Sequence, residues 1–173
     1  MIYSIFKGDD WRFAVNRAFG TAEVESTLEV TEYLQNKLSY VDSERTGIWG
    51  WSYGGFLSLS TLISDRKNTF KCGASVAPVT DWTLYDTYYT ERYMGLLENN
   101  INGYTRARVF DRLNNISKYN KKYFVAHGTH DDNVHFQQSM VIGLKVIKFE
   151  YFDIGYSSLI FKNIDTNIIS FNL

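Results

Sequence analysis

Ser52 is the residue of this sequence whose surroundings most clearly indicate chemistry. It lies in residues 47–56, GIWGWSYGGF, with Gly50 two positions before it and Gly54 two positions after it. This pattern, after an apolar run, is typical of a strained strand-to-helix turn that lifts a serine hydroxyl above a sheet. Side chains at both glycine positions are expected to collide there. We therefore predict that Ser52 is a nucleophile rather than a turn serine, with the Tyr53 N–H directed at a developing oxyanion.

A serine nucleophile needs an acid that orients its histidine base, and residues 125–139, VAHGTHDDNVHFQQS, offer two candidates. Asp131 and Asp132 follow a predicted strand beyond the nucleophile, where an acid of this type is expected. The alternative is a structural role, in which one of them forms an Asx turn or caps the next helix. Position in the chain does not decide between these interpretations.

The histidines of the sequence are His127, His130 and His135, and none follows residue 135. His130 directly precedes Asp131, so the two side chains are expected to diverge on a tight turn. We predict that none of the three histidines is the base for Ser52, because a base must lie within about 2.6–3.2 Å of the hydroxyl.

The elements that must position these residues follow from hydrophobic periodicity and turn residues. Glu23 and Glu25 suit the positive end of the dipole of the first long helix. The sequence predicts helices at 21–38, 88–97, 106–113 and 134–142, a helix whose apolar face is Phe56, Leu59, Leu62 and Ile63, and strands at 45–50, 71–77, 122–126 and 146–154. This alternation predicts an α/β fold with a mostly parallel sheet flanked by helices.

Composition narrows the classes of protein that the chain can represent. Of its 173 residues, 45% are hydrophobic, 21% are charged and the net charge is −1, which argues against a nucleic-acid surface. No apolar run reaches the roughly 18 residues of a membrane span. Cys72 is the only cysteine, so no internal disulfide is possible, and its apolar neighbours predict a buried side chain. Aromatic residues, at 17%, indicate either a rich core or an aromatic-lined pocket.

We divide the chain into a unit at 1–145 and a divergent tail at 146–173. Only about four strands are predicted, and the chain begins in polar residues just before a helix, so we expect that the amino end of a larger domain is missing. The tail consists mostly of Ile, Asn, Lys, Phe, Tyr and Ser, the residues that AT-rich codons specify. Our hypothesis is that part of this tail is translated non-coding sequence.

Four blocks in the same order, GIWGWSYGGF, KCGASVAPVTDW, YDTYYTERYMGL and HGTHDDNVHFQQS, resemble a known family. They are similar to the catalytic domain of the dipeptidyl peptidase IV group, in the prolyl oligopeptidase family of α/β-hydrolases. The resemblance runs from about Gly8 to about Ser139. It implies a partial α/β-hydrolase fold and a serine peptidase that releases dipeptides with proline or alanine second. No metal ion or organic cofactor is implied.

The resemblance also implies a role for individual residues. Ser52 matches the nucleophile, Asp131 the triad acid, and Tyr53 the source of an oxyanion-binding N–H. Asn133 matches a residue that hydrogen-bonds a substrate carbonyl. The positions that line a proline-accepting pocket are matched by Val79, Trp82, Tyr85, Tyr89 and Val134. Aromatic faces suit a flat pyrrolidine ring, although the spacing of Tyr85 and Tyr89 also fits core packing at i and i+4.

The sequence departs from the family pattern in three features. The family order is serine, acid, histidine, so the triad histidine is expected near 153–159, but DIGYSSL contains none. His127 and His135 match family positions outside the triad. The tyrosine that early strands supply to the oxyanion hole and the propeller domain that binds the amino terminus of the substrate are also missing. We therefore expect this chain to be inactive alone. The alternative is a non-catalytic family member that acts as a binding or regulatory subunit, and an esterase or lipase of the same fold is a lesser alternative.

The resemblance implies a peptide substrate and a homodimer for a full-length parent protein. It also implies a plasma-membrane ectodomain with a single span or an extracellular protein, although the sequence shows neither an anchor nor a signal peptide.

Overall fold

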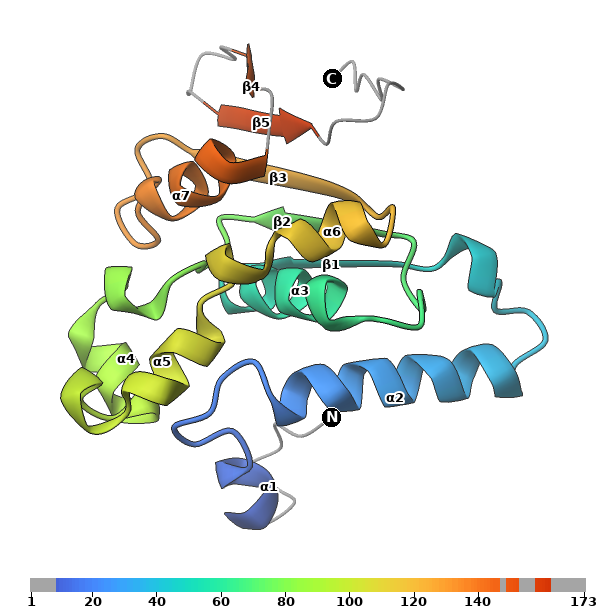
Figure 1. Ribbon diagram of the computed structural model, residues 1–173, viewed down its shortest axis with the longest axis horizontal. Helices are drawn as coiled ribbons and strands as arrows, with labels where there is room; N and C mark the ends of the chain where they lie inside the picture. Colours follow the sequence, from blue (N-terminus) through green and yellow to red (C-terminus); the bar gives the residue numbers. More distant parts are fainter. Residues whose placement is uncertain (1–8, 147–148, 153–157, 163–173) are drawn as a thin grey trace.

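The computed structural model describes residues 9–146, 149–152 and 158–162, and its centre is one sheet with strand order β1-β2-β3-β5-β4 (Figure 1). The strands are β1 (Gly47–Trp51), β2 (Cys72–Val76), β3 (Lys122–Gly128), β4 (Phe149–Phe152) and β5 (Ser158–Lys162). The first three run parallel, whereas β5 pairs antiparallel with both β3 and β4. Since the parallel strands alternate with helices along the chain, the predicted α/β fold is confirmed.

Seven helices of the described residues connect or cover these strands: α1 (Asp9–Phe13), α2 (Ala22–Lys37), α3 (Tyr53–Ser64), α4 (Thr87–Met94), α5 (Ile101–Ala107), α6 (Asn114–Lys118) and α7 (Gln137–Val146). Short 3-10 turns occupy η1 (Ser43–Arg45), η2 (Trp82–Leu84), η3 (Leu97–Asn99) and η4 (Phe110–Arg112). Helix α3 packs between the sheet and α2 (Figure 1). None of the described helices is both long and apolar enough to cross a bilayer.

Most predicted elements are present, with bounds shifted by a few residues. One prediction was wrong, because a single helix at 106–113 is replaced by the end of α5 and the turn η4. The strand predicted at 146–154 is present as the shorter β4, and a further strand, β5, follows it. Residues 153–154 of that predicted strand lie outside the described residues.

The core lies on the side of the sheet that α3 covers. Phe56, Leu59, Leu62 and Ile63, the predicted apolar face of this helix, are all fully buried. Burying such side chains supplies the main favourable free energy of folding. The core therefore fixes α3, and with it the turn that precedes this helix.

The opposite face of the three parallel strands carries exposed side chains. Trp49 is 75% exposed and Trp51 is 69% exposed. The strand register places them in rows with Ala74 and Val76 of β2. Cys72 belongs to the same face and is exposed, so the prediction of a buried cysteine was wrong. Its apolar neighbours in sequence do not determine which face of β2 a helix covers.

Candidate active site

Ser52 lies at the sharp turn between β1 and α3. Its φ of 55° and ψ of −117° are values that a residue with a side chain rarely adopts. Its N–H donates to the Val76 carbonyl at 2.9 Å, and its carbonyl accepts from the Phe56 N–H at 3.0 Å. Hydrogen bonds on both sides therefore hold the strained conformation. The turn predicted from the glycine pattern is present.

The two glycines of the pattern have different roles. A Cβ at Gly50 would overlap the carbonyl group of Gly54, so no larger residue fits there. A Cβ at Gly54 would meet nothing within 4 Å, so the expectation that this position must also be small was wrong. The helix needs the next glycine instead, because a Cβ at Gly55 would lie 3.0 Å from the Cα of Pro78.

The first prediction compares these two glycines. We expect Gly50→Ala to lower the free energy of unfolding by about 1–3 kcal/mol or more, because the added methyl overlaps the backbone of Gly54. Gly54→Ala should change it by less than about 1 kcal/mol, because the site is open and alanine favours the helix. Urea denaturation of both variants measures the difference. Equal losses of stability would contradict this account of the turn.

Asp131 lies in the turn that follows β3. Its Oδ1 accepts hydrogen bonds from the N–H groups of Asn133 and Val134, both at 3.0 Å. Its Oδ2 lies 3.6 Å from Nε2 of His127. Asp131 therefore forms an Asx turn through Oδ1, as the structural interpretation predicted. A catalytic role is not excluded, because it would use the other oxygen, Oδ2. Asp132 is exposed.

The strand register places Ser52 and the loop of Asp131 at the same edge of the sheet. Trp51, Val76 and Ala126 form one row across β1, β2 and β3. Ser52 follows the first member of this row directly, and Asp131 follows the last member by five positions. Adjacent strands are about 4.8 Å apart, so the ends of β1 and β3 are about 10 Å apart. A histidine ring between the two side chains would fit this spacing.

His127 is buried below the Asp131 loop and both of its ring nitrogens have partners. Nε2 lies 2.7 Å from the carbonyl oxygen of Val134, which can only accept, so Nε2 carries the hydrogen. Nδ1 then accepts from the Ser139 hydroxyl at 2.6 Å. Burial lowers the pKa of His127, against the opposing effects of the Val134 carbonyl and Asp131. The ring is therefore neutral near pH 7.

The two other histidines are exposed. Nδ1 of His130 lies 3.1 Å from the Thr129 hydroxyl, and His135 lines a shallow surface pocket. No hydrogen bond joins Ser52 to any histidine in the part of the chain that the structure describes. These contacts support the prediction that none of the three is the base. That histidine was expected near 153–159, of which residues 153–157 lie outside the described ranges.

The second prediction is a pH dependence that originates at His127. Unfolding restores the ordinary pKa of about 6.5, so below this pH the unfolded chain binds a proton that the folded chain does not bind. The free energy of unfolding should fall as the pH falls below about 6.5, by at most about 1.4 kcal/mol per pH unit. His127→Gln, which retains an N–H donor, should flatten this dependence. Urea denaturation between pH 7.5 and 5 measures it, and parallel profiles would contradict the assignment.

The residues expected to line a proline pocket are brought together by the fold. Trp82 and Tyr89 are stacked, with ring centroids 5.9 Å apart and planes at 14°, and Tyr85 meets Trp82 edge-on at 5.9 Å. The ring of Tyr53 lies 5.7 Å from Trp82, so the residue after the nucleophile joins this cluster. Val79, Trp82 and Val134 are almost fully buried, whereas Tyr85 and Tyr89 are half-buried.

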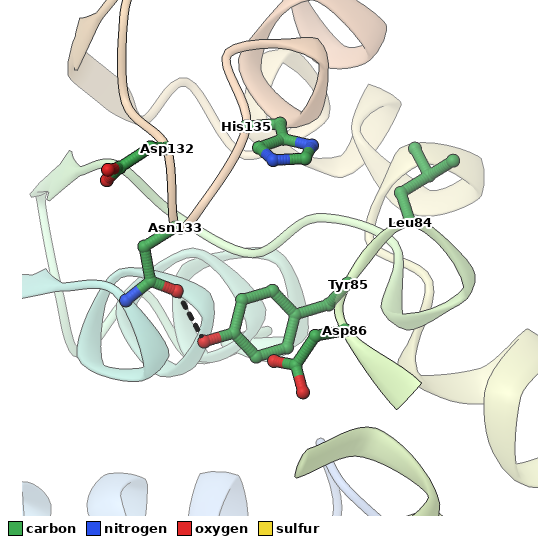
Figure 2. A pocket seen from close by; sticks show the side chains of 6 residues that line it. All are labelled: Leu84, Tyr85, Asp86, Asp132, Asn133 and His135. Atoms are coloured by element: carbon green, nitrogen blue, oxygen red, sulfur yellow. Dashed lines mark hydrogen bonds between the residues drawn. The ribbon is translucent and has the colours of Figure 1, made fainter. Parts of the chain in front are cut away.

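Tyr85 also connects the aromatic cluster to the Asp131 loop. Its hydroxyl donates to Oδ1 of Asn133 at 2.8 Å, and Figure 2 shows the two side chains pointing at each other. Burial, with the nearby charges of Asp86 and Asp131, raises the pKa of Tyr85, so the phenol keeps its proton. Since Oδ1 of Asn133 is the acceptor, its Nδ2 is the group available to donate to a ligand. The surrounding pocket is lined by Leu84, Tyr85, Asp86, Asp132, Asn133 and His135.

Sequence reasoning missed the contact of Glu23 with the turn. This carboxylate is only 4% exposed and accepts from the hydroxyl of Tyr53 at 3.0 Å. It also accepts from the N–H groups of Gly20 and Thr21, at 2.5 and 3.1 Å. The sequence indicated only a favourable position at the start of a helix. No pattern could reveal a partner 30 positions away.

A strained serine between a parallel strand and a helix, with an aspartate loop at the same sheet edge, defines a domain of the α/β-hydrolase class. No cluster of three or more metal-ligating side chains occurs among the described residues. The model of the prolyl oligopeptidase family (Peptidase_S9) matches residues 4–148. The chain therefore belongs to the prolyl oligopeptidase family, and the family resemblance inferred from the sequence is confirmed.

The similar proteins are dipeptidyl peptidases. The chain is 48% identical over 146 residues to "Venom dipeptidyl peptidase 4" of Apis mellifera, covering 83% of this chain and 19% of the relative. It is 44% identical over 144 residues to "Dipeptidyl peptidase 4" of Bos taurus, covering 82% and 18%. The crystal structure of Porphyromonas gingivalis dipeptidyl peptidase 4 matches with a TM-score of 0.73 at 37% identity, covering 80% of this chain and 19% of that one. The chain thus spans about a fifth of the length of these relatives.

Proposed function

We propose that this chain forms part of the catalytic domain of a serine-type dipeptidyl peptidase. The observation that supports this most is the strained turn at Ser52, which presents a serine at the sheet edge where the Asp131 loop also lies. The similarity to proteins named dipeptidyl peptidase 4 supports the substrate class. The substrates would be peptides with proline or alanine in the second position, cleaved through an acyl-enzyme.

Each candidate residue has a defined step in this proposal. The Ser52 hydroxyl attacks the carbonyl carbon of the second substrate residue and gives its proton to a histidine, which Asp131 orients. The Tyr53 N–H stabilises the oxyanion, because it lies in the first turn of α3, at the positive end of the helix dipole. The histidine then protonates the leaving amine, and water releases the dipeptide from Ser52.

The substrate would be held by the aromatic cluster and the Asp131 loop. Stacked and edge-on rings suit the flat, rigid side chain of proline. The proposed pocket residues are Val79, Trp82, Tyr85, Tyr89 and Val134. Asn133 would donate from Nδ2 to a substrate carbonyl, since the Tyr85 hydroxyl already occupies its Oδ1.

We further propose that residues 1–145 form a partial α/β-hydrolase catalytic domain and that 146–173 are a divergent tail. No histidine follows residue 135 in the sequence, so this chain alone should not hydrolyse peptides. Loss of the base of a triad lowers the turnover rate on the order of 10⁶-fold. The same observation favours a second candidate, a non-catalytic binding or regulatory subunit. On the family resemblance, we propose that the parent protein is extracellular or a membrane-anchored ectodomain, and that it is a homodimer.

A chimera tests the proposal independently of the missing histidine. Residues 4–148, which match the family model, replace the aligned segment of honeybee venom dipeptidyl peptidase 4. The relative contributes the remaining length, where the family order places the triad histidine after the acid. We expect the chimera to hydrolyse Gly-Pro-p-nitroanilide. A folded chimera without activity would favour the non-catalytic alternative. The 173-residue chain itself should not react with a fluorophosphonate probe, and labelling at Ser52 would show that it contains its own base.

A further inference from the structure

Gln138 is a fully buried glutamine in the first turn of α7, and its side chain binds a distant segment of the chain. Its Oε1 accepts from the N–H groups of Thr80 and Asp81, at 2.8 and 2.9 Å. Its Nε2 donates to the Asp81 carbonyl at 3.0 Å. The Thr80 hydroxyl lies 2.6 Å from the backbone carbonyl oxygen of Gln138. One side-chain amide therefore pairs with backbone groups of two consecutive residues, Thr80 and Asp81.

The segment that Gln138 binds carries one wall of the proposed proline pocket. Thr80 and Asp81 are both buried and lie between Val79 and Trp82. Asp81 also begins the turn η2, where its Oδ1 accepts from the Thr83 N–H at 2.9 Å. The position of the indole ring of Trp82 therefore depends on the segment that the glutamine holds.

The helix that carries Gln138 follows the loop of Asp131. Its neighbour Ser139 hydrogen-bonds His127, which in turn donates to Val134 in that loop. The glutamine thus links the loop that carries the catalytic acid to the wall that carries Trp82. Closer to solvent, the hydrogen bond from Tyr85 to Asn133 is a second link between the chain that follows Trp82 and the Asp131 loop (Figure 2).

We propose that Gln138 is a positioning residue that sets specificity for proline, an inference that rests on the proposed function. The glutamine fixes the separation between the Trp82 wall and the acid loop, so the pocket keeps the width of a pyrrolidine ring. Without it, the pocket loses contacts that proline uses and alanine does not. One methylene group in an apolar pocket is worth roughly 10–200-fold in kcat/KM, so the preference for proline over alanine should fall about 10-fold.

Gln138→Met tests the inference, because methionine has a similar volume without the amide. The matched control is Gln137→Met, since Gln137 is the preceding residue of α7 and is exposed. In the chimera, Gln138→Met should raise the KM for Gly-Pro-p-nitroanilide about 10-fold and leave that for Gly-Ala-p-nitroanilide within about twofold. Partial unfolding alone would lower kcat for both substrates equally. That result, or unchanged kinetics, would overturn the inference.

A measurement on the 173-residue chain does not depend on catalysis. The chain is labelled with 5-fluorotryptophan, and the Trp82 resonance is assigned with Trp82→Phe. Gln138→Met should shift this resonance while those of Trp49 and Trp51 stay in place, and Gln137→Met should shift none. Thr80→Val, a milder change that removes only a hydroxyl, should move it in the same direction by less. An unchanged Trp82 resonance overturns the inference, whereas an inactive unmodified chimera overturns the proposed function alone.

Discussion

Ser52→Ala is expected to lower hydrolysis of Gly-Pro-p-nitroanilide by the chimera by about 10⁶-fold, with little change in KM. The substitution removes the oxygen that would form the acyl-enzyme. Alanine keeps the backbone that makes the turn, because the hydrogen bonds of residue 52 to Val76 and Phe56 use only main-chain atoms. The effect should therefore appear in kcat and leave the binding of the substrate intact.

A serine within the helix α3, which follows Ser52, provides the control for this variant. Ser60 is buried, and its hydroxyl has no hydrogen-bond partner in the described part of the chain. Ser60→Ala should leave kcat within about twofold, since surface and packing near Ser52 are unaffected. The fluorophosphonate probe should label the chimera and its Ser60→Ala variant but not Ser52→Ala. Labelling that survives in Ser52→Ala would show that another residue is the nucleophile.

The turn at Ser52 could be predicted from sequence because its determinants are local. Gly50 and the apolar residues on both sides of the serine lie within a few positions of each other, and a positive φ at the serine follows from the pattern. The open space beside Gly54, which would admit a side chain, could not be predicted, because it depends on the direction in which a Cβ at this position would point. The sequence pattern treats both glycines alike.

The predicted helix at 106–113 failed because tertiary contacts override local propensity. Arg108 is extended, with φ −70° and ψ 113°, and the next N–H, of Val109, donates to the Thr80 carbonyl at 3.0 Å. A hydrogen bond across 29 positions thus replaces one that would continue the helix. The apolar periodicity correctly indicates that Val109 and Leu113 are buried, but it does not indicate the type of element that buries them.

The same limit applies to the residues around the site. Glu23 and Gln138 contact partners 30 and 57–58 positions away, and nothing in their neighbourhood in the sequence indicates this. Only the resemblance to a family could group Val79, Trp82 and Asn133 before the structure was known. Periodicity alone places Tyr85 and Tyr89 on a common face, which is equally consistent with core packing.

Asp131→Asn should lower kcat of the chimera by about 10⁴-fold, the size of effect expected when a triad acid becomes an amide. The asparagine Oδ1 can still accept from the N–H groups of Asn133 and Val134, so the loop should keep its conformation. Only the group in the place of Oδ2 changes, from an acceptor to a donor. The histidine would then lose the partner that fixes its tautomer.

Two further variants separate catalysis by Asp131 from its structural role. Asp131→Ala removes the loop hydrogen bonds as well, so it should also lower the free energy of unfolding, by about 1–3 kcal/mol. Asp132→Asn changes an exposed carboxylate one position away and should leave kcat within about twofold. Steady-state kinetics with urea denaturation distinguish the three variants. A larger loss of kcat in Asp132→Asn than in Asp131→Asn would reassign the acid to Asp132, whereas equal small losses would remove both from the mechanism.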